Sequence, residues 1–583
     1  MHLVTATLAV AALALTADRV GRWALRAVAF ESASVSIILG LGLLGYVTFA
    51  LGLLGLLHAP VVVALLIVGT ALSARDALAG LRRFAALSLG GKAGVLVAAA
   101  MLVLVYLVAL RPPTEWDATM YHLAYAKRYA ATHHVAPVWE LRFPVFPQLN
   151  DMLFTLAFLA GGEPAPALVE LLLAGATAAA VAAWGRRVWS PAVGAWAAAL
   201  WLGNPLVVFL AATPYIDVGL CAFTTLAAMA FVRNADDGPP GWLAVAAMAA
   251  GFAAGTKYLG LAVVGIVGLA VLVQRRSIAA AVGFGAVALV AAAPFYLYDF
   301  IHTGDPLFPF GAPVFGFGAW SPADLALQLG EMRSHGTGRG LGSLLLLPWN
   351  LTVHQGAFQP EAPMLPLLLP GLVAAALALR RDPRLRWPLA LALAYGVLWF
   401  FGMQAMRYLI PVSAVLSLAL AASAARWADR RHAWILALVL AAPGAGYAAY
   451  RLADGGVPVT AAGREAYLAA ELPGYAALAW LNRTHGSRYH VYALGFERMY
   501  YFADGKMDGD WFGRGRFADA LAYREDPAGL HRHLRALGAD HLLLHVAASD
   551  RPMLPPEVVD SAAFRDRFEA IYADPRSRLY RLR

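Results

Sequence analysis

The strongest constraint on the fold is a series of apolar runs, each close to the length of a membrane-spanning helix. About 20 apolar residues are needed to cross about 30 Å of hydrocarbon as a helix. Only 14% of the 583 residues are charged, whereas soluble domains carry about 25%. A wholly soluble fold is therefore excluded. Fourteen runs come close to the required length, at residues 3–17, 34–57, 60–75, 94–110, 166–184, 192–212, 216–232, 242–256, 258–273, 278–297, 364–380, 386–402, 406–424 and 433–450.

These runs predict a mainly α-helical, polytopic transmembrane bundle of about 13–14 helices, and the charges between them predict its orientation. Alternate connections carry the basic residues, and such connections normally stay in the cytoplasm. These residues are Arg19, Arg22, Arg26, Arg75, Arg82, Arg83, Lys92, Arg186, Arg187, Arg233, Arg275, Arg276, Arg380, Arg381, Arg384, Arg386, Arg426, Arg430 and Arg431. The other connections are short and nearly uncharged, or long, at 111–165, 299–363 and after 451. We expect the long segments to be extracytoplasmic.

The composition also indicates a cellular location and argues against one class of partner. Only four of the 45 basic residues are lysines, and Ala, Leu and Gly are abundant, which is typical of a GC-rich bacterial genome. The expected location is the inner (plasma) membrane of a bacterium, with multiple passes. The net charge of +9 is explained by arginines in the cytoplasmic connections, so the lipid bilayer is an expected partner and nucleic acid is not.

Beyond the last apolar run, the composition becomes that of a soluble domain. Residues 451–463 contain Gly and Pro and are expected to link a transmembrane domain over 1–450 to an α/β domain over 464–583. RYHVYAL, ADHLLLHVA and SRLYRLR predict strands, with helical patterns between them. This part of the sequence contains no Gly-rich phosphate loop. We expect a periplasmic or extracellular domain that caps the membrane domain or docks a substrate.

The first long outer segment contains RPPTEWDATMYHLAYAKRYA, which is rich in candidate site residues. Residues 117–132 have helical spacing and are expected to lie flat on the outer membrane interface. On a regular α-helix, Asp117, Tyr121 and Arg128 would share one face, because positions i, i+4 and i+11 nearly coincide. The alternative is that Asp117 only caps the helix, with Glu115 solvated beside it.

Three more charged residues break the arginine-inside pattern at the outer ends of apolar runs. They are Asp217 in TPYIDVGL, Lys257 in GTKYLG and Arg407 in MQAMRYLIP. Each alone is equally consistent with an anchor at the interface. Together with Asp117 and Arg128 they predict a polar cavity at the outer leaflet, since ionisable groups in membrane helices usually mark functional sites. Cations hold phosphate, and a carboxylate takes a proton from an attacking hydroxyl.

These features resemble the GT-C superfamily of polytopic glycosyltransferases. The resemblance rests on the acid-containing first outer segment, TPYIDVGL, GTKYLG, GDPLFPF and QAMRYLIP, and it extends over most of residues 94–450. The sequence looks most like bacterial members related to the protein mannosyltransferases and the lipid A aminoarabinose transferases. The resemblance implies an enzyme whose donor is a sugar on a polyprenyl phosphate and whose acceptor, a protein, lipid or glycan, is extracytoplasmic.

The resemblance also implies roles for the acidic residues. The acid of the first outer segment acts as or near the catalytic base, which corresponds to Asp117 or Glu115, because this sequence has Glu-Trp-Asp where the family often has adjacent acids. Asp217 corresponds to the second-loop acid. In a single displacement the base deprotonates the acceptor hydroxyl, and the anomeric centre is inverted. This scheme needs no cofactor, although a divalent metal between Asp117, Asp217 and the phosphate is an alternative.

Basic residues would stabilise the donor phosphate in this scheme. Lys257 and Arg407 are expected to do so, with Arg128 and Arg142 as further candidates and Tyr121 on the face of Asp117. The main alternative function is a secondary transporter or flippase of a lipid-linked or polar substrate, because many helices with charged residues also describe carriers. Carriers usually have internal repeats with interrupted helices, and the sequence has no convincing repeat.

Overall fold

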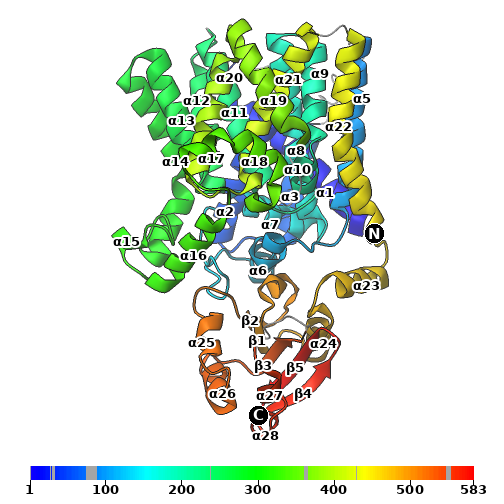
Figure 1. Cartoon of the computed structure of the whole chain (residues 1–583), viewed down its shortest axis with the longest axis vertical. Coiled ribbons are helices and arrows are strands. Elements are labelled where there is room, and N and C mark those ends of the chain that lie inside the picture. Colours follow the sequence, from blue (N-terminus) through cyan, green and yellow to red (C-terminus); the bar gives the residue numbers. More distant parts are fainter. Residues whose placement is uncertain are drawn as a thin grey trace.

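The structure is a computed structural model. It describes residues 2–26, 28, 33–73, 88–236, 238–359, 365–427, 430–546 and 553–583. These residues form a helical bundle with a smaller α/β domain at one end (Figure 1). The N-terminal end of α1 lies at that same end of the bundle (Figure 1). Arg75, Arg82 and Arg83, which are expected in a cytoplasmic connection, lie outside the described residues.

Each of the fourteen predicted apolar runs contains a helix. Among the described residues, eight helices are long and apolar enough to cross a membrane, or nine if the bent pair α9 and α10 is one span. The predicted polytopic α-helical bundle with a C-terminal sheet is therefore confirmed. The bundle helices are α1 (His2–Ala24), α2 (Ala33–Leu53), α3 (Ala59–Ser73), α5 (Leu89–Ala109), α8 (Ala165–Val188), α9 (Pro191–Leu202), α10 (Pro205–Ala211), α11 (Asp217–Ala235), α12 (Gly241–Thr256), α13 (Gly260–Arg275), α14 (Ile278–Thr303), α19 (Leu365–Arg381), α20 (Arg386–Phe401), α21 (Ile410–Trp427) and α22 (Arg430–Ala453).

One predicted run is not a straight helix. Within residues 192–212, α9 and α10 meet at an angle of 73°. The side chain of Asn204 caps α10 by accepting a hydrogen bond from the backbone N–H of Leu206 (3.0 Å). Pro205 occupies the first position of α10, where its missing N–H costs nothing. A local start signal therefore interrupts the apolar run and begins a new helix.

The two long outer segments are themselves largely helical. The first forms the π-helix η1 (Ala118–His122), α6 (Leu123–Thr132) and the buried helix α7 (Leu149–Gly161). The second forms α15 (Ala312–Phe315), α16 (Pro322–Ser334), α17 (Leu341–Leu345), α18 (Leu347–Val353) and the 3-10 helix η2 (Gln355–Phe358). Two more 3-10 helices, η3 (Pro383–Leu385) and η4 (Met406–Leu409), precede α20 and α21.

The helix at 117–132 is covered on one side, and its predicted position flat on the membrane interface stays a prediction. The C-terminal domain covers it, because the 3-10 helix η5 (Glu497–Phe502) packs against both η1 and α6. Tyr125 and Tyr129 on α6 are buried. An amphipathic pattern shows that one face is covered, but it does not distinguish lipid from a folded domain as the cover.

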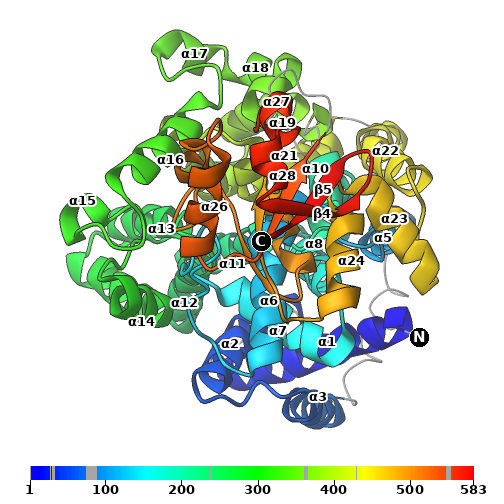
Figure 2. The ribbon, with the colours of Figure 1, turned by 90° about the horizontal axis from the view of Figure 1, so that it is seen from below.

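The α/β domain contains a five-stranded sheet with the order β2-β1-β3-β5-β4. β1 pairs in parallel with β2 and β3, and β5 is antiparallel to β3 and β4. Seen from below, β4 and β5 lie in front of the middle of the bundle, with α1 to α3 and α13 to α14 at its edges (Figure 2). The strands are β1 (His490–Leu494), β2 (Lys506–Asp508), β3 (His541–His545), β4 (Phe568–Ala573) and β5 (Ser577–Leu582).

Helices pack around this sheet and connect it to the bundle. Between the two domains, α22 ends at Ala453 and α23 begins at Ala461. The predicted boundaries of the linker and of the two domains remain predictions. The helices of the domain are α23 (Ala461–Glu471), α24 (Tyr475–His485), η5, α25 (Phe517–Leu521), α26 (Pro527–Ala536), α27 (Pro556–Val559) and α28 (Ala562–Arg565).

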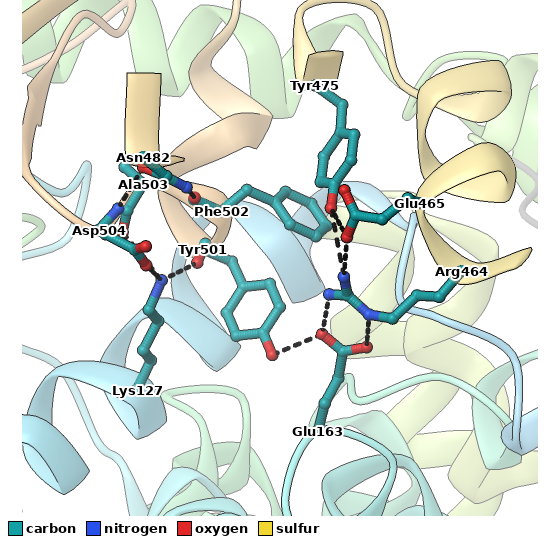
Figure 3. A network of polar contacts seen from close by, with 10 residues as sticks. All are labelled: Lys127, Glu163, Arg464, Glu465, Tyr475, Asn482, Tyr501, Phe502, Ala503 and Asp504. Carbon is teal, nitrogen blue, oxygen red and sulfur yellow. Dashed lines mark hydrogen bonds and ion pairs between the residues drawn. The ribbon is translucent and has the colours of Figure 1, made fainter. Parts of the chain in front are cut away.

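A network of ion pairs holds the α/β domain against the first outer segment and the start of α8 (Figure 3). Glu163 accepts two hydrogen bonds from the guanidinium of Arg464, at 2.7 and 2.5 Å, and a third from the Tyr501 hydroxyl at 3.0 Å. Lys127 lies 2.7 Å from Asp504 and donates to the backbone carbonyls of Tyr501, in η5, and of Ala503, which follows η5. Each contact joins an outer segment of the bundle to the C-terminal domain.

We predict that Glu163→Gln loosens this docking. The side chains of Arg464 and Glu163 are 32% and 19% exposed, and a hydrogen bond to a charged group contributes roughly 1.5–3 kcal/mol. Hydrogen exchange of the η5 and α23 amides should therefore become faster in the variant. Glu465→Gln is the matched control, since Glu465 also contacts Arg464 but lies within the C-terminal domain and is more exposed. Equal exchange in the wild type and in Glu163→Gln would contradict the predicted role of Glu163.

Candidate active site

Asp117 precedes η1 and faces the start of α21. Its Oδ2 lies 2.7 Å from Nη2 of Arg407, which belongs to η4. Its backbone N–H donates to the hydroxyl of Tyr215 (3.3 Å), in the connection between α10 and α11. The Asp117 side chain is 17% exposed and that of Arg407 is 7% exposed. Three segments that are distant in the sequence therefore meet at this ion pair.

A second ion pair lies next to the first. Oδ1 of Asp217, at the start of α11, is 3.0 Å from Nζ of Lys257, in the turn between α12 and α13. The Lys257 ammonium lies 3.8 Å from the ring centroid of Tyr408, and the Arg407 guanidinium lies 5.3 Å from the same centroid. Tyr408 therefore connects the two ion pairs. The structure brings together the four charged residues that the sequence places at the outer ends of separate segments.

The charges around Asp117 affect its protonation. Burial alone would raise the pKa of this carboxyl group, but the positive charges of Arg407, His122 and Lys257 lower the pKa below its ordinary value. Asp117 is therefore ionised at neutral pH. A bound anion that weakened its contact with Arg407 would make it a stronger base.

Arg407 has hydrogen-bonding capacity that the described residues leave unused. Its Nη2 contacts Asp117, whereas its buried Nε and Nη1 have no hydrogen-bond partner among the described residues. Buried N–H groups are normally satisfied, and a guanidinium binds phosphate oxygens through paired N–H donors. The unsatisfied side of Arg407 is therefore suited to bind an oxyanion.

Tyr121 lies beside Asp117, and its neighbour His122 forms a buried contact with Asp151 that the sequence does not predict. The Tyr121 ring packs edge-on against Phe146 at 5.9 Å, and burial, with the charge of Asp117, raises its pKa well above the ordinary value. Nδ1 of His122 lies 2.7 Å from Oδ1 of Asp151 on α7, and both side chains are almost fully buried. A carboxylate within a short apolar helix is the only sequence signal that points to Asp151.

Glu115, the alternative to Asp117 as the base, is held by another arginine. Its Oε1 lies 2.5 Å from Nη2 of Arg451 near the end of α22, and its Oε2 accepts a hydrogen bond from the backbone N–H of Thr114 (3.1 Å). This pair ties the first outer segment to the last membrane helix. Although Glu115 and Asp117 are two residues apart, they contact different arginines on different helices.

Arg128 does not share a face with Asp117, so this part of the prediction is wrong. Its side chain is half exposed, and its guanidinium lies 3.9 Å from the carboxylate of Glu140. The intervening η1 is a π-helix, in which hydrogen bonds join residues i and i+5. Each residue then turns by less than in an α-helix, so positions i and i+11 no longer coincide.

Arg142, the other candidate phosphate contact, is paired with a carboxylate of the C-terminal domain. Its Nη2 and Nε donate to Oδ1 of Asp510 in the C-terminal domain, at 2.9 and 3.2 Å, and its guanidinium lies 4.5 Å from the ring centroid of Phe512. Trp320, from the second outer segment, donates Nε1–H to the backbone carbonyl of Arg142 (3.0 Å). Its charge is already paired with a carboxylate that lies 368 residues away in the sequence, and sequence spacing does not reveal such a partner.

No metal centre is evident in the part of the chain that the structure describes. Within it, no group of three or more His, Cys, Asp and Glu side chains is arranged to hold a metal ion. Asp117 and Asp217, which could supply oxygen ligands, each contact a basic side chain instead. The lone cysteine, Cys221, is buried in α11.

Two family models match separate parts of this chain. Residues 144–298 match the model described as dolichyl-phosphate-mannose-protein mannosyltransferase. Residues 463–581 match the model described as SF2091/S2213. An uncharacterized protein of Shigella flexneri, SF2093/S2215, is 42% identical over 64 residues, which are 10% of this chain and 32% of that protein. The chain thus matches only about a third of the length of this relative.

Solved structures resemble most of the chain. ArnT from Cupriavidus metallidurans, bound to undecaprenyl phosphate, aligns with a TM-score of 0.51 and 14% identity, covering 83% of this chain and 97% of ArnT. The oligosaccharyltransferase of Archaeoglobus fulgidus, in complex with zinc and sulfate, aligns with a TM-score of 0.51 and 14% identity, covering 77% of this chain and 68% of that protein. Both relatives are GT-C glycosyltransferases. The resemblance predicted from the sequence is confirmed, and the chain has the GT-C fold.

Proposed function

We propose that this chain is a membrane glycosyltransferase that transfers a sugar from a polyprenyl-phosphate donor to an extracytoplasmic acceptor. The observation that carries the proposal is Arg407, a buried guanidinium that contacts Asp117 and keeps two unsatisfied N–H donors. A phosphate that binds these donors would lie next to a carboxylate. Sugar transfer from a phosphate-linked donor needs this arrangement, because a cation must stabilise the leaving phosphate while a nearby base takes the proton of the attacking hydroxyl.

An apolar groove near Arg407 supports a lipid-linked donor. The groove has a volume of about 550 Å³ and lies among α18, α19, α20 and α21. It extends to Leu409, two residues after Arg407, so a lipid tail in the groove would bring its phosphate close to that side chain. The alignment with ArnT bound to undecaprenyl phosphate is consistent with such a donor. Among the residues that line the groove are Leu347, Leu351, Leu372, Trp399, Leu409 and Val412.

The chemical step is a single displacement at the anomeric carbon. The acceptor oxygen forms a bond to this carbon while the bond to the phosphate oxygen breaks, and the electron pair stays on the phosphate. Arg407 and Lys257 stabilise the charge that develops on the leaving phosphate. Asp117 takes the proton of the acceptor hydroxyl. Because attack and departure occur on opposite sides, the reaction inverts the anomeric centre.

Asp117 is a better candidate for the base than Glu115. Asp117 contacts Arg407, whose unsatisfied donors suit the phosphate, whereas Glu115 is bound to Arg451 and to the backbone of Thr114. The role of Glu115 is to hold the first outer segment against α22. Asp217 orients the ammonium of Lys257.

The membrane placement that fits this reaction has the C-terminal domain on the periplasmic or extracellular side of a bacterial inner membrane. The N-termini of α8 and α13 approach the site. Their C-terminal turns, at the far end of the bundle, carry Arg186 and Arg187 in α8 and Arg275 in α13. Retention of positive charge in the cytoplasm then puts Asp117 and the α/β domain outside.

Incubation of the purified protein with a panel of polyprenyl-phosphate sugars and extracytoplasmic acceptors tests the function. We expect release of polyprenyl phosphate together with glycosylation of the acceptor. Movement of the intact lipid across a vesicle membrane without release would support a transporter or flippase instead.

We predict that Asp117→Asn reduces transfer by at least about a hundred-fold, since general base catalysis contributes roughly 10²–10⁴-fold. Glu115→Gln is the matched variant and should retain most of the transfer rate, with a lower melting temperature from the broken contact with Arg451. Single-turnover rates with saturating donor separate the two effects. Near-normal rates in Asp117→Asn, or a loss only in Glu115→Gln, would refute this choice of base.

The pH dependence should differ between the free and the donor-bound enzyme. In the free enzyme, Arg407 helps to hold the pKa of Asp117 below its ordinary value, so kcat/KM should persist to acidic pH and fall only as Asp117 becomes protonated. Bound phosphate shares the charge of Arg407 with Asp117 and adds negative charge, which raises the pKa of Asp117. The acidic limb of kcat should therefore lie about one pH unit or more above that of kcat/KM. Identical acidic limbs would contradict this sharing of the Arg407 charge.

A further inference from the structure

The C-terminal domain inserts a basic side chain beside the candidate active site. Arg498 belongs to η5, the 3-10 helix that packs against η1. Its Nη2 donates to the backbone carbonyl of Thr114, and its guanidinium lies 5.5 Å from the ring centroid of Trp116. Both contacts are to the segment that immediately precedes Asp117.

Arg498 forms no ion pair in the described parts of the chain, unlike other arginines at this domain interface, although the charges of Glu115, Glu497 and Glu471 act on it from a distance. Arg142 and Arg464 each donate two hydrogen bonds to a carboxylate of the opposite domain. In contrast, no ion pair joins Arg498 to any carboxylate in the described parts of the chain, and its buried Nε has no hydrogen-bond partner there. Burial lowers the pKa of Arg498, although Glu115 and Tyr215 partly oppose this effect.

An unpaired and partly buried guanidinium is unfavourable unless an anion binds to it. Removing a charge from water is costly, and buried charges in proteins are usually paired. The hydrogen bond to Thr114 satisfies one donor but does not compensate the charge. Two roles would explain a guanidinium at this position: it binds an anionic ligand, or its contact with Thr114 is needed to dock the C-terminal domain. Experiments distinguish the two roles.

Tyr215 relates Arg498 to the two residues at the centre of the site. The hydroxyl of Tyr215 accepts a hydrogen bond from the backbone of Asp117, and the Arg407 guanidinium lies 5.0 Å from its ring centroid. Arg498 is close enough for its charge to act on the same tyrosine. Arg407 therefore lies beside Tyr215, and Arg498 contacts the segment that precedes Asp117; each guanidinium keeps an unsatisfied buried N–H donor.

We propose that Arg498 is an anion-binding residue of the site, so that the site is complete only when the C-terminal domain is docked. Its ligand is an oxyanion, either the phosphate of the donor or an acidic group of the acceptor. The choice between these sources rests on the proposed function, but anion binding by Arg498 does not. The contacts of Glu163 with Tyr501, and of Lys127 with the backbone carbonyls of Tyr501 and Ala503, hold η5 in position (Figure 3).

The first test uses inorganic phosphate and the full chain in detergent. Phosphate should raise the melting temperature of the wild type and of Arg483→Gln, a control that removes an exposed arginine from α24 of the same domain. The rise should be smaller in Arg498→Gln and largely restored in Arg498→Lys, which keeps the charge. Equal rises in the wild type and Arg498→Gln, or no rise in the wild type, would overturn the proposal.

A purely structural role for Arg498 is tested by hydrogen exchange of the η1 and η5 amides. Arg498→Gln keeps an amide donor for the Thr114 carbonyl, so protection should match the wild type while the phosphate effect is reduced. If Gln and Lys variants lose protection equally and lose the phosphate effect equally, Arg498 only fixes the docking, and the proposal fails.

The second test distinguishes the two sources of the anion. If Arg498 binds the donor, Arg498→Gln should weaken undecaprenyl phosphate binding by about ten-fold or more, since charge-assisted hydrogen bonds are strong. If it binds the acceptor, this Kd is unchanged and the KM for the acceptor rises instead. The wild type could bind inorganic phosphate through Arg498 and yet neither bind undecaprenyl phosphate nor release it from any donor. That result would support this inference and refute the proposed function. No change in either constant would overturn the inference.

Discussion

The ion pair between Asp117 and Arg407 is the interaction around which the end of the bundle that carries the C-terminal domain is arranged. A charged side chain at the edge of hydrocarbon is expensive unless it is paired, so each charge there must find a partner from another segment. Arg407 meets Asp117 from the first outer segment, and the rings of Tyr215 and Tyr408 lie beside its guanidinium. Because the pair joins η4 to the residue that precedes η1, it fixes the start of α21 against that segment. Two donors of Arg407 remain for a ligand.

The same rule explains how the C-terminal domain is attached. Its interface with the bundle uses charged side chains paired across the domains, including Lys127 with Asp504, Arg142 with Asp510 and Glu163 with Arg464. Such pairs fix orientation, since an arginine and a carboxylate that share two hydrogen bonds tolerate little rotation. The domain therefore does more than cover the membrane region, because its docked position sets where η5 lies relative to Asp117.

Part of the candidate site could be predicted from the sequence because membrane helices constrain where charge is tolerated. Asp217, Lys257 and Arg407 stand out as charges at the outer ends of apolar runs, and the structure brings them together with Asp117. Asp151 does not stand out, because its pairing with His122 depends on how α7 packs against η1. Arg142, in contrast, stands out as an unpaired charge in the sequence, because its partner Asp510 is distant along the chain.

The sequence by itself determined the polytopic helical bundle, the C-terminal α/β segment and the grouping of charges at one end, because hydrophobic length and helical period are local properties. Only the tertiary structure decided which carboxylate meets which arginine. It pairs Asp117 with Arg407 and Glu115 with Arg451, although the two acids are separated by a single residue. It also turned Arg128 away through a π-helix. These outcomes depend on distances of a few ångströms between segments hundreds of residues apart, and no local pattern encodes them.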